Sequence, residues 1–570
     1  MSSPQELEIV ERLKTAIGAD SVLEAKFPRP RRLFVTVPKQ SLQSAARYLK
    51  ESEGFSHLST VTGLDNGKDL EVIYHLNRVD VELSLRTKAS YDDPTLPTTT
   101  GIIPGSVLYE REVHDLVGVS FEGHPDLSPL VLPDGWPATL HPLRKNMTIE
   151  QIRSAYPGPA ASPPQESPEE NTFLVPFGPQ HPALKEPESF TFKVDGETVV
   201  EVKPRIGYNH RGVEKALENQ TWIQNQILIE RVCGICSCSH TQCYTQGVEE
   251  LLGLQIPPRI HYLRTALFEL NRIHSHYLWL GVAGHEIGFD TLFMYVWRDR
   301  EIVMDILEAL TGNRNTYSMN IIGGLRRDFT PEMIEKTKKA MDILEQKAKE
   351  YKKLVLAEPT LMKRVARVGV LRPRDAIDTC AVGPTMRACG IKRDVRADDP
   401  HASYSEIPFN VITYDGCDIA SMTVVRLDEL VESTHIVKYA LSHLPDGPAS
   451  VRAPRRIPQG EVVSRVEAPR GELIHYQRSN GTEKPERYKL RCPTLANVPA
   501  VVKMLTGGNV ADIPIALAAI DPCFSCTDRM TFLDERTGKR WVWSEDDLKR
   551  YSRACAAGKV KNPVQMANVG

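Results

Sequence analysis

Two short stretches carry the same cysteine spacing: RVCGICSCSH at residues 231–240 and DPCFSCTDR at residues 521–529. Each holds one C-x-x-C pair, Cys233 with Cys236 and Cys523 with Cys526. Two intervening residues let both sulfur atoms of a pair face one metal ion while the backbone turns around it. Four thiolates would make a soft, electron-rich site that suits zinc, iron–sulfur or another late transition metal.

The separation of the two pairs leaves three interpretations open. A structural zinc ribbon usually separates its pairs by ~15–20 residues, whereas almost the whole C-terminal domain lies between these two. The second pair follows the apolar run 513–520 and Asp-Pro, where we expect a buried loop. The spacing therefore favours a catalytic metal over structural zinc, and unrelated cysteines are the third interpretation.

The composition of the 570-residue chain excludes several classes of protein. Hydrophobic residues make up 41% and charged residues 25%, which is enough apolar material for large cores and excludes wholesale disorder. With 70 basic against 73 acidic residues, the net charge is −3, so we expect no nucleic-acid partner. Eleven cysteines are too few for a disulfide-stapled secreted scaffold.

The N-terminus and the hydrophobic runs indicate the compartment. Residues 1–14, MSSPQELEIVERLK, lack the apolar core and small-residue cleavage site of a signal peptide. The most apolar runs, 277–283 and 513–520, are far shorter than the ~18 residues that cross a bilayer. We expect a soluble, cytoplasmic chain that reaches a membrane only through partner subunits.

A proline-rich segment, YPGPAASPPQESPEEN at 156–171, predicts an extended linker between two domains. The pattern before it predicts an α+β domain over 1–155, with helices at 6–17 and 41–48 and strands at 31–38, 72–76 and 79–85. The pattern after it predicts a large, mainly α domain with a small β portion over 172–529, with strand-like FTFKVDG and TVVEVKP and helical periodicity over 260–280, 297–310 and 331–355.

The residues that flank the cysteines resemble a known family. R-x-C-G-x-C-x-x-x-H at 231–240 and D-P-C-x-x-C-x-x-R at 521–529 look like the two signature motifs of nickel–iron hydrogenase large subunits. Other segments resemble the same superfamily: FGPQHPA (177–183), NHRGVEKALEN (209–219), GPTMRACG (383–390), EAPRGE (467–472) and CPTLAN (492–497).

Three N-terminal segments resemble the 30-kDa subunit of respiratory complex I: EREVHDLVG (110–118), GHPDL (123–127) and HPLRKN (141–146). A 30-kDa-like domain fused to a 49-kDa-like, hydrogenase-type domain is similar to the large subunits of formate hydrogenlyase and hydrogenase-4. These belong to group 4, the energy-converting, membrane-associated nickel–iron hydrogenases. The resemblance implies the nickel–iron hydrogenase large-subunit fold and the reversible conversion of protons and electrons into H2.

The resemblance also assigns the metal ligands. Four cysteines would hold a Ni–Fe centre whose iron carries CO and two cyanides. Cys233 and Cys523 would be terminal nickel ligands, and Cys236 and Cys526 would bridge nickel and iron.

Three further residues match positions around that centre. Arg470, in APRG, would lie over the diatomic ligands and donate hydrogen bonds to an anionic cyanide. Thr494, in PTLAN, matches the position that hydrogen-bonds the other cyanide. His240, four residues after Cys236, would donate to the bridging sulfur and tune the metals.

Two glutamates match functional positions. Glu186, in HPALKEPE, matches the glutamate that accepts the proton in membrane-bound hydrogenases, with Glu188 as its rival. Glu214, in RGVE, matches a ligand of a second metal, usually Mg. In standard hydrogenases the C-terminal motif ends in histidine, but here Arg529 stands in that place, which an Mg²⁺ ion cannot use as a ligand.

Two alternatives to a hydrogenase stay open. The 49-kDa subunit of complex I keeps GPQHPA, lacks the four cysteines and binds quinone through a histidine, where this chain has Lys185. A zinc-stabilised assembly module is the non-enzyme alternative. The retained cysteines and the missing histidine favour the hydrogenase.

The resemblance implies several partners. No further C-x-x-C pair is present, so electrons would pass through Fe–S clusters on a small subunit. Complex I-like membrane subunits would hold the chain on the cytoplasmic face of the inner membrane, and formate dehydrogenase or ferredoxin would supply electrons. Nickel chaperones would load the site, and a peptidase would then cleave between Arg529 and Met530 and release residues 530–570.

Overall fold

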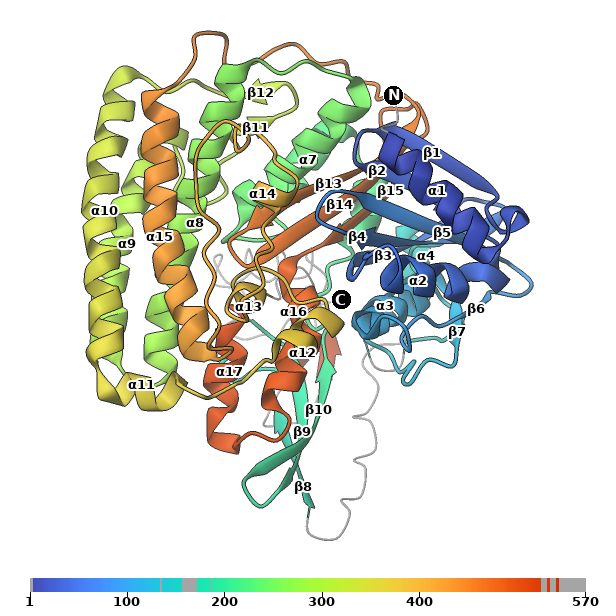
Figure 1. Cartoon of the computed structure of the whole chain (residues 1–570), viewed down its shortest axis with the longest axis horizontal. Coiled ribbons are helices and arrows are strands. Elements are labelled where there is room, and N and C mark those ends of the chain that lie inside the picture. The colour runs from blue at the N-terminus through green and yellow to red at the C-terminus, as the bar shows by residue number, and fades with distance from the viewer. Residues whose placement is uncertain are drawn as a thin grey trace, which may run out of the picture.

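The computed structural model describes residues 4–133, 136–155, 172–184 and 186–523, together with the backbone of two short paired strands, Thr531–Leu533 (β16) and Arg540–Val542 (β17). The described residues form a sheet-based N-terminal unit and a larger unit built on long helices (Figure 1). The predicted linker 156–171, Lys185, Cys526, Arg529 and the predicted cleavage site lie outside the described residues.

The N-terminal unit is built on a five-stranded sheet in the order β1-β2-β5-β4-β3. Strands β2 and β5 run parallel, and the other neighbours run antiparallel. The strands are Glu24–Arg29 (β1), Arg32–Thr36 (β2), His57–Asp65 (β3), Asp69–Asn77 (β4) and Glu82–Ser90 (β5). The helices are Pro4–Ile17 (α1), Leu42–Glu51 (α2), Val107–Val117 (α3) and Ile149–Ala155 (α4), and a small parallel pair joins Thr95–Pro97 (β6) to Ser120–Glu122 (β7). The predicted α+β class of this unit is confirmed.

Both faces of the N-terminal sheet are covered, which follows from the period-two alternation of its strands. Leu33 and Val35 of β2 point into a core that they share with Ile9 of α1 and Leu42 of α2. Phe34, between them, points to the opposite face. There it packs with Ile73 of β4 against apolar side chains of the larger unit, namely Val463, Ile474 and Tyr476.

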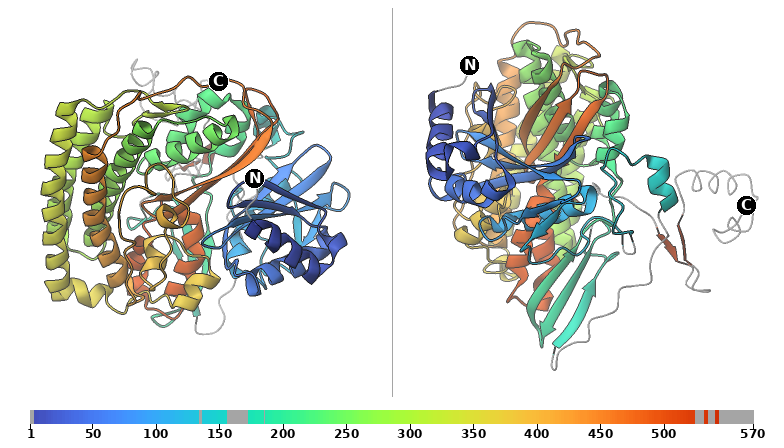
Figure 2. Two further views of the ribbon diagram at one scale, coloured as in Figure 1. Left: turned by 45° about the horizontal axis from the view of Figure 1, so that its top comes forward. Right: turned by 90° about the vertical axis from the view of Figure 1, so that its right-hand side faces the viewer.

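Four long helices form the body of the larger unit and lie side by side in Figures 1 and 2. They are Pro258–Glu286 (α8), Asp290–Thr311 (α9), Pro331–Ala357 (α10) and Ile419–Ser442 (α15). The first three confirm the helices predicted at 260–280, 297–310 and 331–355, although α8 and α9 begin earlier. Pro258 opens α8 because proline suits the first turn of a helix, where its missing N–H is not needed.

Two three-stranded sheets complete the larger unit. One is formed by Thr172–Phe177 (β8), Ser189–Asp195 (β9) and Thr198–Arg205 (β10), and projects below the body in Figure 1. The other, antiparallel throughout, is formed by Gly460–Ala468 (β13), Gly471–Ser479 (β14) and Pro485–Arg491 (β15). Figures 1 and 2 show this second sheet between the helices and the N-terminal unit. The predicted mainly α class with a small β portion is confirmed.

Shorter elements connect these parts. The helices are Val213–Asn219 (α5), Trp222–Glu230 (α6), Ser237–Leu252 (α7), Pro359–Val365 (α11), Pro373–Asp378 (α12), Pro384–Arg387 (α13), Val395–Asp398 (α14), Pro493–Leu505 (α16) and Ile513–Ala519 (α17). A two-stranded hairpin pairs Asn320–Ile321 (β11) with Gly324–Leu325 (β12).

A charged seam, formed by Arg487, Lys489 and Arg491 of β15, joins the two units. These side chains alternate along the strand and are buried. Arg487 Nε donates to the carbonyl of Gly63 at 2.9 Å, and Arg491 Nε donates to the carbonyl of Ser59 at 2.6 Å, both on β3. Lys489 Nζ lies 2.5 Å from a carboxylate oxygen of Glu112 on α3. Buried cations need partners, so this seam fixes the N-terminal unit against the larger one.

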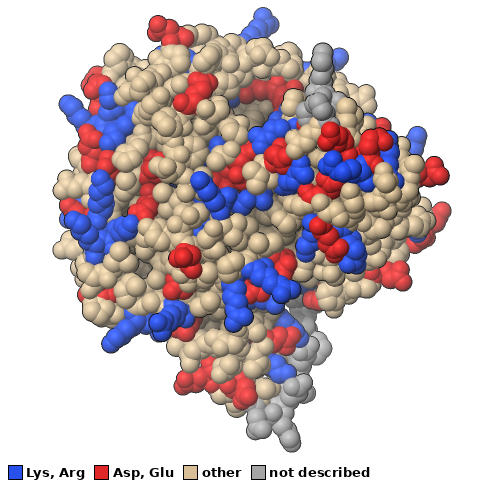
Figure 3. Space-filling view, viewed as in Figure 1, with Lys and Arg blue, Asp and Glu red and all other residues tan. Residues whose placement is uncertain are grey.

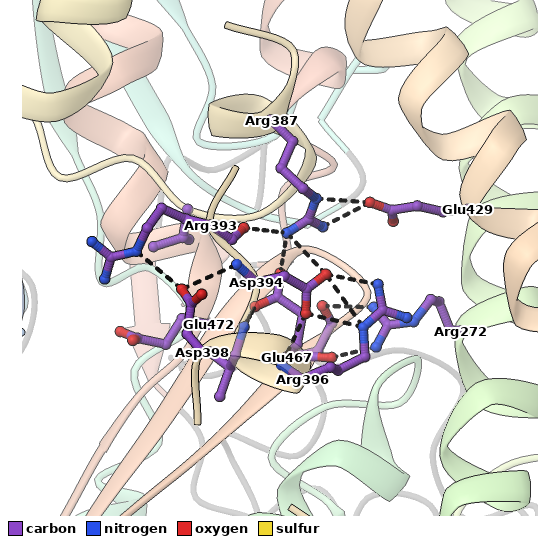
Figure 4. A network of polar contacts seen from close by, with 12 residues as sticks. Arg272, Arg387, Arg393, Asp394, Arg396, Asp398, Glu429, Glu467 and Glu472 are labelled. Carbon is purple, nitrogen blue, oxygen red and sulfur yellow. Dashed lines mark hydrogen bonds and ion pairs between the residues drawn. The ribbon is translucent and has the colours of Figure 1, made fainter. Parts of the chain in front are cut away.

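A second buried network of charges includes Glu467 of β13 (Figure 4). Arg387 donates to Glu467 at 2.6 Å and to Glu429 at 2.9 Å. Arg396 pairs with Asp394 at 2.8 Å, and its other terminal nitrogen lies 3.2 Å from Glu269 on α8. The network therefore connects α8, α13, α14, α15 and β13 in the interior.

Glu269 is expected to contribute stability that depends on pH. Burial raises the pKa of this carboxyl, but the attraction of Arg272 and Arg396 outweighs it and lowers the pKa from 4.5 to about 2. The contribution is therefore complete above pH 4.5 and is lost as the pH falls toward 2. Glu269→Gln should cost about 3 kcal/mol of unfolding free energy at pH 7 and clearly less at pH 3.

Chemical unfolding of the two proteins at pH 7 and pH 3 checks this expectation. Glu335→Gln is the matched control, because Glu335 pairs with Lys338 on the exposed face of α10, where a salt bridge contributes only about 0–1 kcal/mol. An equal loss for Glu269→Gln at both pH values would contradict the ionic origin of the effect.

Two features relate to the predicted location: the charges on the surface, and the length and hydropathy of the helices. Basic and acidic side chains are interspersed on the face shown in Figure 3. Among the helices of the described residues, none is both long enough and apolar enough to cross a membrane.

Candidate metal centre

Three of the four predicted cysteine ligands come together in the interior. Cys233 and Cys236 form a small buried cluster with Cys523, which lies 290 residues further along the chain. The sulfur atoms of Cys233 and Cys523 are 3.1 Å apart, and both thiols are free. The backbone N–H groups of Ile235 and Cys236 donate to the Cys233 sulfur at 3.4 and 3.2 Å. Such bonds stabilise a thiolate, which is the form that binds metals.

Residues of the surrounding motifs hold the first cysteine loop in place. Arg211, in NHRG, donates to the carbonyls of Arg231 and Val232 at 2.9 and 2.8 Å. Asn271 of α8 donates to the carbonyl of Ile235 at 2.8 Å. The loop is therefore anchored on both sides of Cys233, which reduces the cost of ordering it when a ligand binds.

Arg470 lies beside the cysteine cluster and is held rigidly. Its Nε donates to the carbonyl of Asp521 at 2.6 Å, one terminal nitrogen lies 2.9 Å from the Asp521 carboxylate, and the other donates to Ser275 of α8 at 3.1 Å. Burial lowers the pKa of Arg470, but attraction to Asp521, Cys523, Cys236 and Cys233 outweighs it and raises the pKa above its ordinary value. A permanent positive charge therefore faces the thiols.

Gly383, in GPTMRACG, lets the backbone pass close to Arg470. A Cβ atom at this position would lie 2.3 Å from the carbonyl oxygen of Arg470, and the φ of Gly383 is +67°. Both facts favour glycine. The glycine of this motif thus allows the backbone to pack closely against the turn that contains Arg470.

His240 occupies the first turn of α7, which begins directly after Cys236. Its backbone N–H donates to the carbonyl of Cys236 at 3.3 Å. The side chain is fully buried, and Nε2 has no hydrogen-bond partner among the residues that the structure describes. A buried nitrogen without a partner is costly, so this atom is suited to a group that the protein alone does not supply.

Glu186 and Glu188 lie on one loop that reaches the cluster, and the loop is tied down by Asn209, whose amide donates to the carbonyl of Pro187 at 2.7 Å. A carboxylate oxygen of Glu186 is 3.9 Å from the sulfur of Cys523, and the side chain is partly exposed. Glu188 is buried, and its backbone N–H donates to the carbonyl of Pro179 at 2.9 Å. Glu186 therefore lies close to a cysteine sulfur.

Thr494 also contacts the cluster. Its hydroxyl oxygen accepts the backbone N–H of Cys523 at 3.1 Å. The hydroxyl hydrogen remains available as a donor, as the predicted role toward a cyanide requires.

The structure does not favour the predicted magnesium ligand. Glu214 is buried between two cations of the charged seam: its carboxylate lies 2.8 Å from Arg487 and 3.3 Å from Lys489. Burial raises the pKa of Glu214, but these two cations outweigh it and lower the pKa below its ordinary value. Two positive charges occupy the position where a divalent ion would have to bind. The surroundings of Glu214 do not fit Mg²⁺, and we assign none there.

A cavity of about 80 Å³ opens beside the cluster. Its lining is mostly apolar and includes Val131 of the N-terminal unit, Ile206, Leu490 and Val498. Cys523 and Thr494 form part of its wall. Small apolar molecules therefore have space next to the cysteine cluster.

The described residues fit part of the expected cofactor environment. Hydrogen bonding with Cys236 and burial raise the pKa of Cys233, and contact with Cys233 together with burial raises that of Cys523. A bound cation reverses this effect and holds thiols as thiolates. Among the described residues, no three His, Cys, Asp or Glu side chains are arranged to hold an ion by themselves, and Cys526 lies outside them.

Asp521 is a functional candidate that the sequence reasoning missed. It belongs to the D-P-C-x-x-C motif, for which the sequence analysis assigned no role to the aspartate, yet its carbonyl and carboxylate anchor Arg470. Its backbone φ is +53°, an unusual value for a non-glycine residue. An acidic residue two positions before the first cysteine of the motif, followed by proline, was the signal available in the sequence.

Comparisons with known proteins agree with the fold. Three family models match: the respiratory-chain NADH dehydrogenase 30-kDa subunit over 35–153, the 49-kDa subunit over 286–457 and 450–529, and nickel-dependent hydrogenase over 211–281. Formate hydrogenlyase subunit 5 of Escherichia coli is 37% identical, covering 93% of this chain and 95% of the relative. Hydrogenase-4 component G of the same organism is 34% identical, covering 95% and 96%.

A solved structure of an archaeal membrane-bound sulfane sulfur reductase contains a similar chain. It is 30% identical with a TM-score of 0.61, and the match covers 63% of this chain and 99% of that one. The fold and the cysteine site thus define a subunit of the superfamily that unites complex I with nickel-dependent hydrogenases. Within it, the chain belongs to the family of group 4 nickel–iron hydrogenase large subunits in which a 30-kDa-like domain is fused to the 49-kDa-like one.

Proposed function

We propose that this chain is the catalytic subunit of an energy-converting nickel–iron hydrogenase, which interconverts protons, electrons and H2. The observation that carries the proposal is the buried cluster of Cys233, Cys236 and Cys523 with Arg470 fixed beside it. With Cys526, these cysteines would hold a Ni–Fe centre whose iron carries CO and two cyanides. When bound, this centre supplies the cleavage or formation of the H–H bond.

The chain's own residues would orient and tune that centre. Arg470 would donate to one cyanide and place a positive charge beside it. Thr494 would donate its free hydroxyl hydrogen to the other cyanide, since its oxygen already accepts from Cys523. His240 would donate from Nε2, which has no partner among the described residues, to a bridging sulfur.

Glu186 would take and return the proton. The distance of 3.9 Å between its carboxylate and the Cys523 sulfur is longer than a tight hydrogen bond and would close by a small side-chain movement. Its partial exposure allows exchange with solvent. The proton would therefore leave the site through the loop that carries Glu186.

The surrounding complex follows from the family. We propose an Fe–S small subunit, complex I-like membrane subunits that hold the chain on the cytoplasmic face of the inner membrane, and formate dehydrogenase or ferredoxin as the electron donor. The proposed domains are a docking domain at 1–155, a linker at 156–171, a catalytic domain at 172–529 and an extension at 530–570. Nickel chaperones and a peptidase that cuts after Arg529 would complete the centre.

An infrared spectrum of the complex purified from its native host tests the proposal, together with its nickel and iron content. We expect one CO band, two CN bands and about one nickel per chain. A processed, fully assembled complex without these bands would overturn the hydrogenase assignment. A spectrum without bands from a chain that still ends at Gly570 calls for the same measurement on cleaved protein.

The same sample separates the two alternatives. A complex I-type subunit would hold no nickel and would reduce or bind quinone, and the apolar cavity next to Cys523 is the observation that keeps this alternative open. A zinc-stabilised module would hold zinc without nickel and without CO or CN bands.

A further inference from the structure

His240 heads a chain of hydrogen bonds that leads away from the cysteine cluster. Its Nδ1 is 3.3 Å from Nε2 of His475 on β14. The other nitrogen of His475, Nδ1, is 2.7 Å from the hydroxyl of Tyr488 on β15. The Tyr488 oxygen also accepts from the amide of Gln477, its cross-strand neighbour, at 3.4 Å. All four side chains are fully buried.

At least one of the two facing nitrogens, Nδ1 of His240 and Nε2 of His475, must accept a hydrogen bond, and an imidazole that accepts one is neutral. A neutral imidazole carries one N–H and one acceptor nitrogen. The directions of the His240–His475 and His475–Tyr488 hydrogen bonds are therefore set together by a single choice of tautomer. That choice decides whether His240 presents a proton or a lone pair at Nε2.

The hydroxyl of Tyr488 decides between the two tautomers. It contacts Nε2 of Gln477, a nitrogen that can only donate, and Nδ1 of His475. If His475 carried its proton on Nδ1, the Tyr488 O–H would have no acceptor among the described residues, at a cost of about 1–3 kcal/mol. Tyr488 therefore donates to Nδ1 of His475, and His475 donates from Nε2 to His240.

We propose that His475 and Tyr488 are positioning residues that fix the proton of His240 on Nε2. The proton then lies on the nitrogen that has no other partner among the described residues, in the first turn of the helix that begins after Cys236. This inference rests on the proposed function, because it supplies the donor that tunes a bridging sulfur. It explains why the neighbouring strands β14 and β15 carry a buried histidine and a buried tyrosine within hydrogen-bond distance of each other.

Tyr488→Phe tests the proposal with the smallest change, because it removes only the hydroxyl. Without that donor, His475 no longer prefers the tautomer with its proton on Nε2. In a fraction of the protein molecules, His240 then carries no proton on its own Nε2. The sulfur and iron then become richer in electrons, and CO and CN stretches move to lower wavenumber. We expect either a second set of three infrared bands at lower wavenumber or a shift of the whole set, with nickel content unchanged.

Tyr244→Phe is the matched control. Tyr244 is an equally buried tyrosine in contact with the Tyr488 ring. Its hydroxyl donates to the carbonyl of Trp222, which does not belong to the series of hydrogen bonds that begins at His240. Its bands should match those of the unsubstituted protein. A second test uses a His240→Gln background, in which Tyr488→Phe should cause no further shift because the imidazole that it orients is gone.

The outcomes separate the inference from the proposed function. Absence of CO and CN bands in the unsubstituted complex would overturn the proposed function itself. Bands that are present but unchanged in both Tyr488→Phe and His475→Phe would overturn the positioning role alone. Equal shifts in Tyr488→Phe and Tyr244→Phe would also overturn it, because they would show a general packing effect.

Discussion

Cys233→Ser is expected to abolish hydrogen production and to remove nickel from the assembled complex. Cys233 lies at the centre of the cluster, 3.1 Å from the Cys523 sulfur, and accepts two backbone N–H groups. A serine hydroxyl is a hard ligand that ionises poorly and does not replace a soft thiolate. Loss of a residue that only supports a ligand typically costs about 10–100-fold in metal affinity or activity. Loss of a ligand should exceed that range.

Cys243→Ser is the matched control for this prediction. Cys243 is also fully buried, on α7, and its thiol donates to the carbonyl of Ser464 at 3.2 Å, a bond that a serine hydroxyl can keep. Nickel content by mass spectrometry and H2 evolution from a reduced dye should stay close to those of the unsubstituted complex. Normal nickel content in Cys233→Ser would contradict the ligand assignment.

Glu186→Gln is expected to slow hydrogen turnover by about 10²–10⁴-fold, the range typical for removing a general acid or base. The amide keeps the shape of the side chain but cannot accept and release the proton. The contact between the Glu186 carboxylate and the Cys523 sulfur is the physical basis. Nickel content and the infrared bands should persist, because the residue is not expected to bind metal.

Glu188→Gln provides the comparison, since the two glutamates lie on the same loop and were rivals for the role. Glu188 is buried, and its backbone N–H donates to the carbonyl of Pro179, a bond that this substitution keeps. We expect its turnover to remain within about tenfold of the unsubstituted complex, well above that of Glu186→Gln. The opposite order, measured by H2 evolution and by H/D exchange, would assign the proton acceptor to Glu188.

Local patterns predicted the fold class well, because each long element is internally consistent. The helical periodicity of residues 331–355 is realised in α10, and the strand predicted at 31–38 is realised in β2. The ends of elements were harder to predict. The helix expected at 41–48 continues to Glu51, because nothing in its pattern stops it before Gly54, whose φ is +77°.

The candidate site was predictable only where a motif marks it. The cysteine pairs and Arg470 lie in segments with distinctive neighbours, whereas His475 and Tyr488 lie inside ordinary strands. A buried histidine in a strand has the same sequence pattern as any other core position. Its meaning comes from the facing residue on α7, 235 positions away.

The alternating cations of β15 are a second case in which the sequence pattern alone predicts the wrong environment for a residue. A strand with Arg487, Lys489 and Arg491 on one face ordinarily predicts contact with water. Here that face is buried against β3 and α3, and it takes up the carboxylate of Glu214 as well. The seam thus explains both an unexpected buried face and the poor fit of magnesium.

The charged seam also bears on the order in which the chain is completed during translation. Domains generally fold as they leave the ribosome, the N-terminal one first, so β3 and α3 are already folded when residues 487–491 emerge. A basic strand that has not yet paired stays hydrated, whereas an apolar strand would expose hydrophobic surface to water. Cys523 follows last, after the seam has formed. The nascent protein therefore holds Cys233 and Cys236 in an almost finished scaffold before Cys523 arrives to complete the buried cluster.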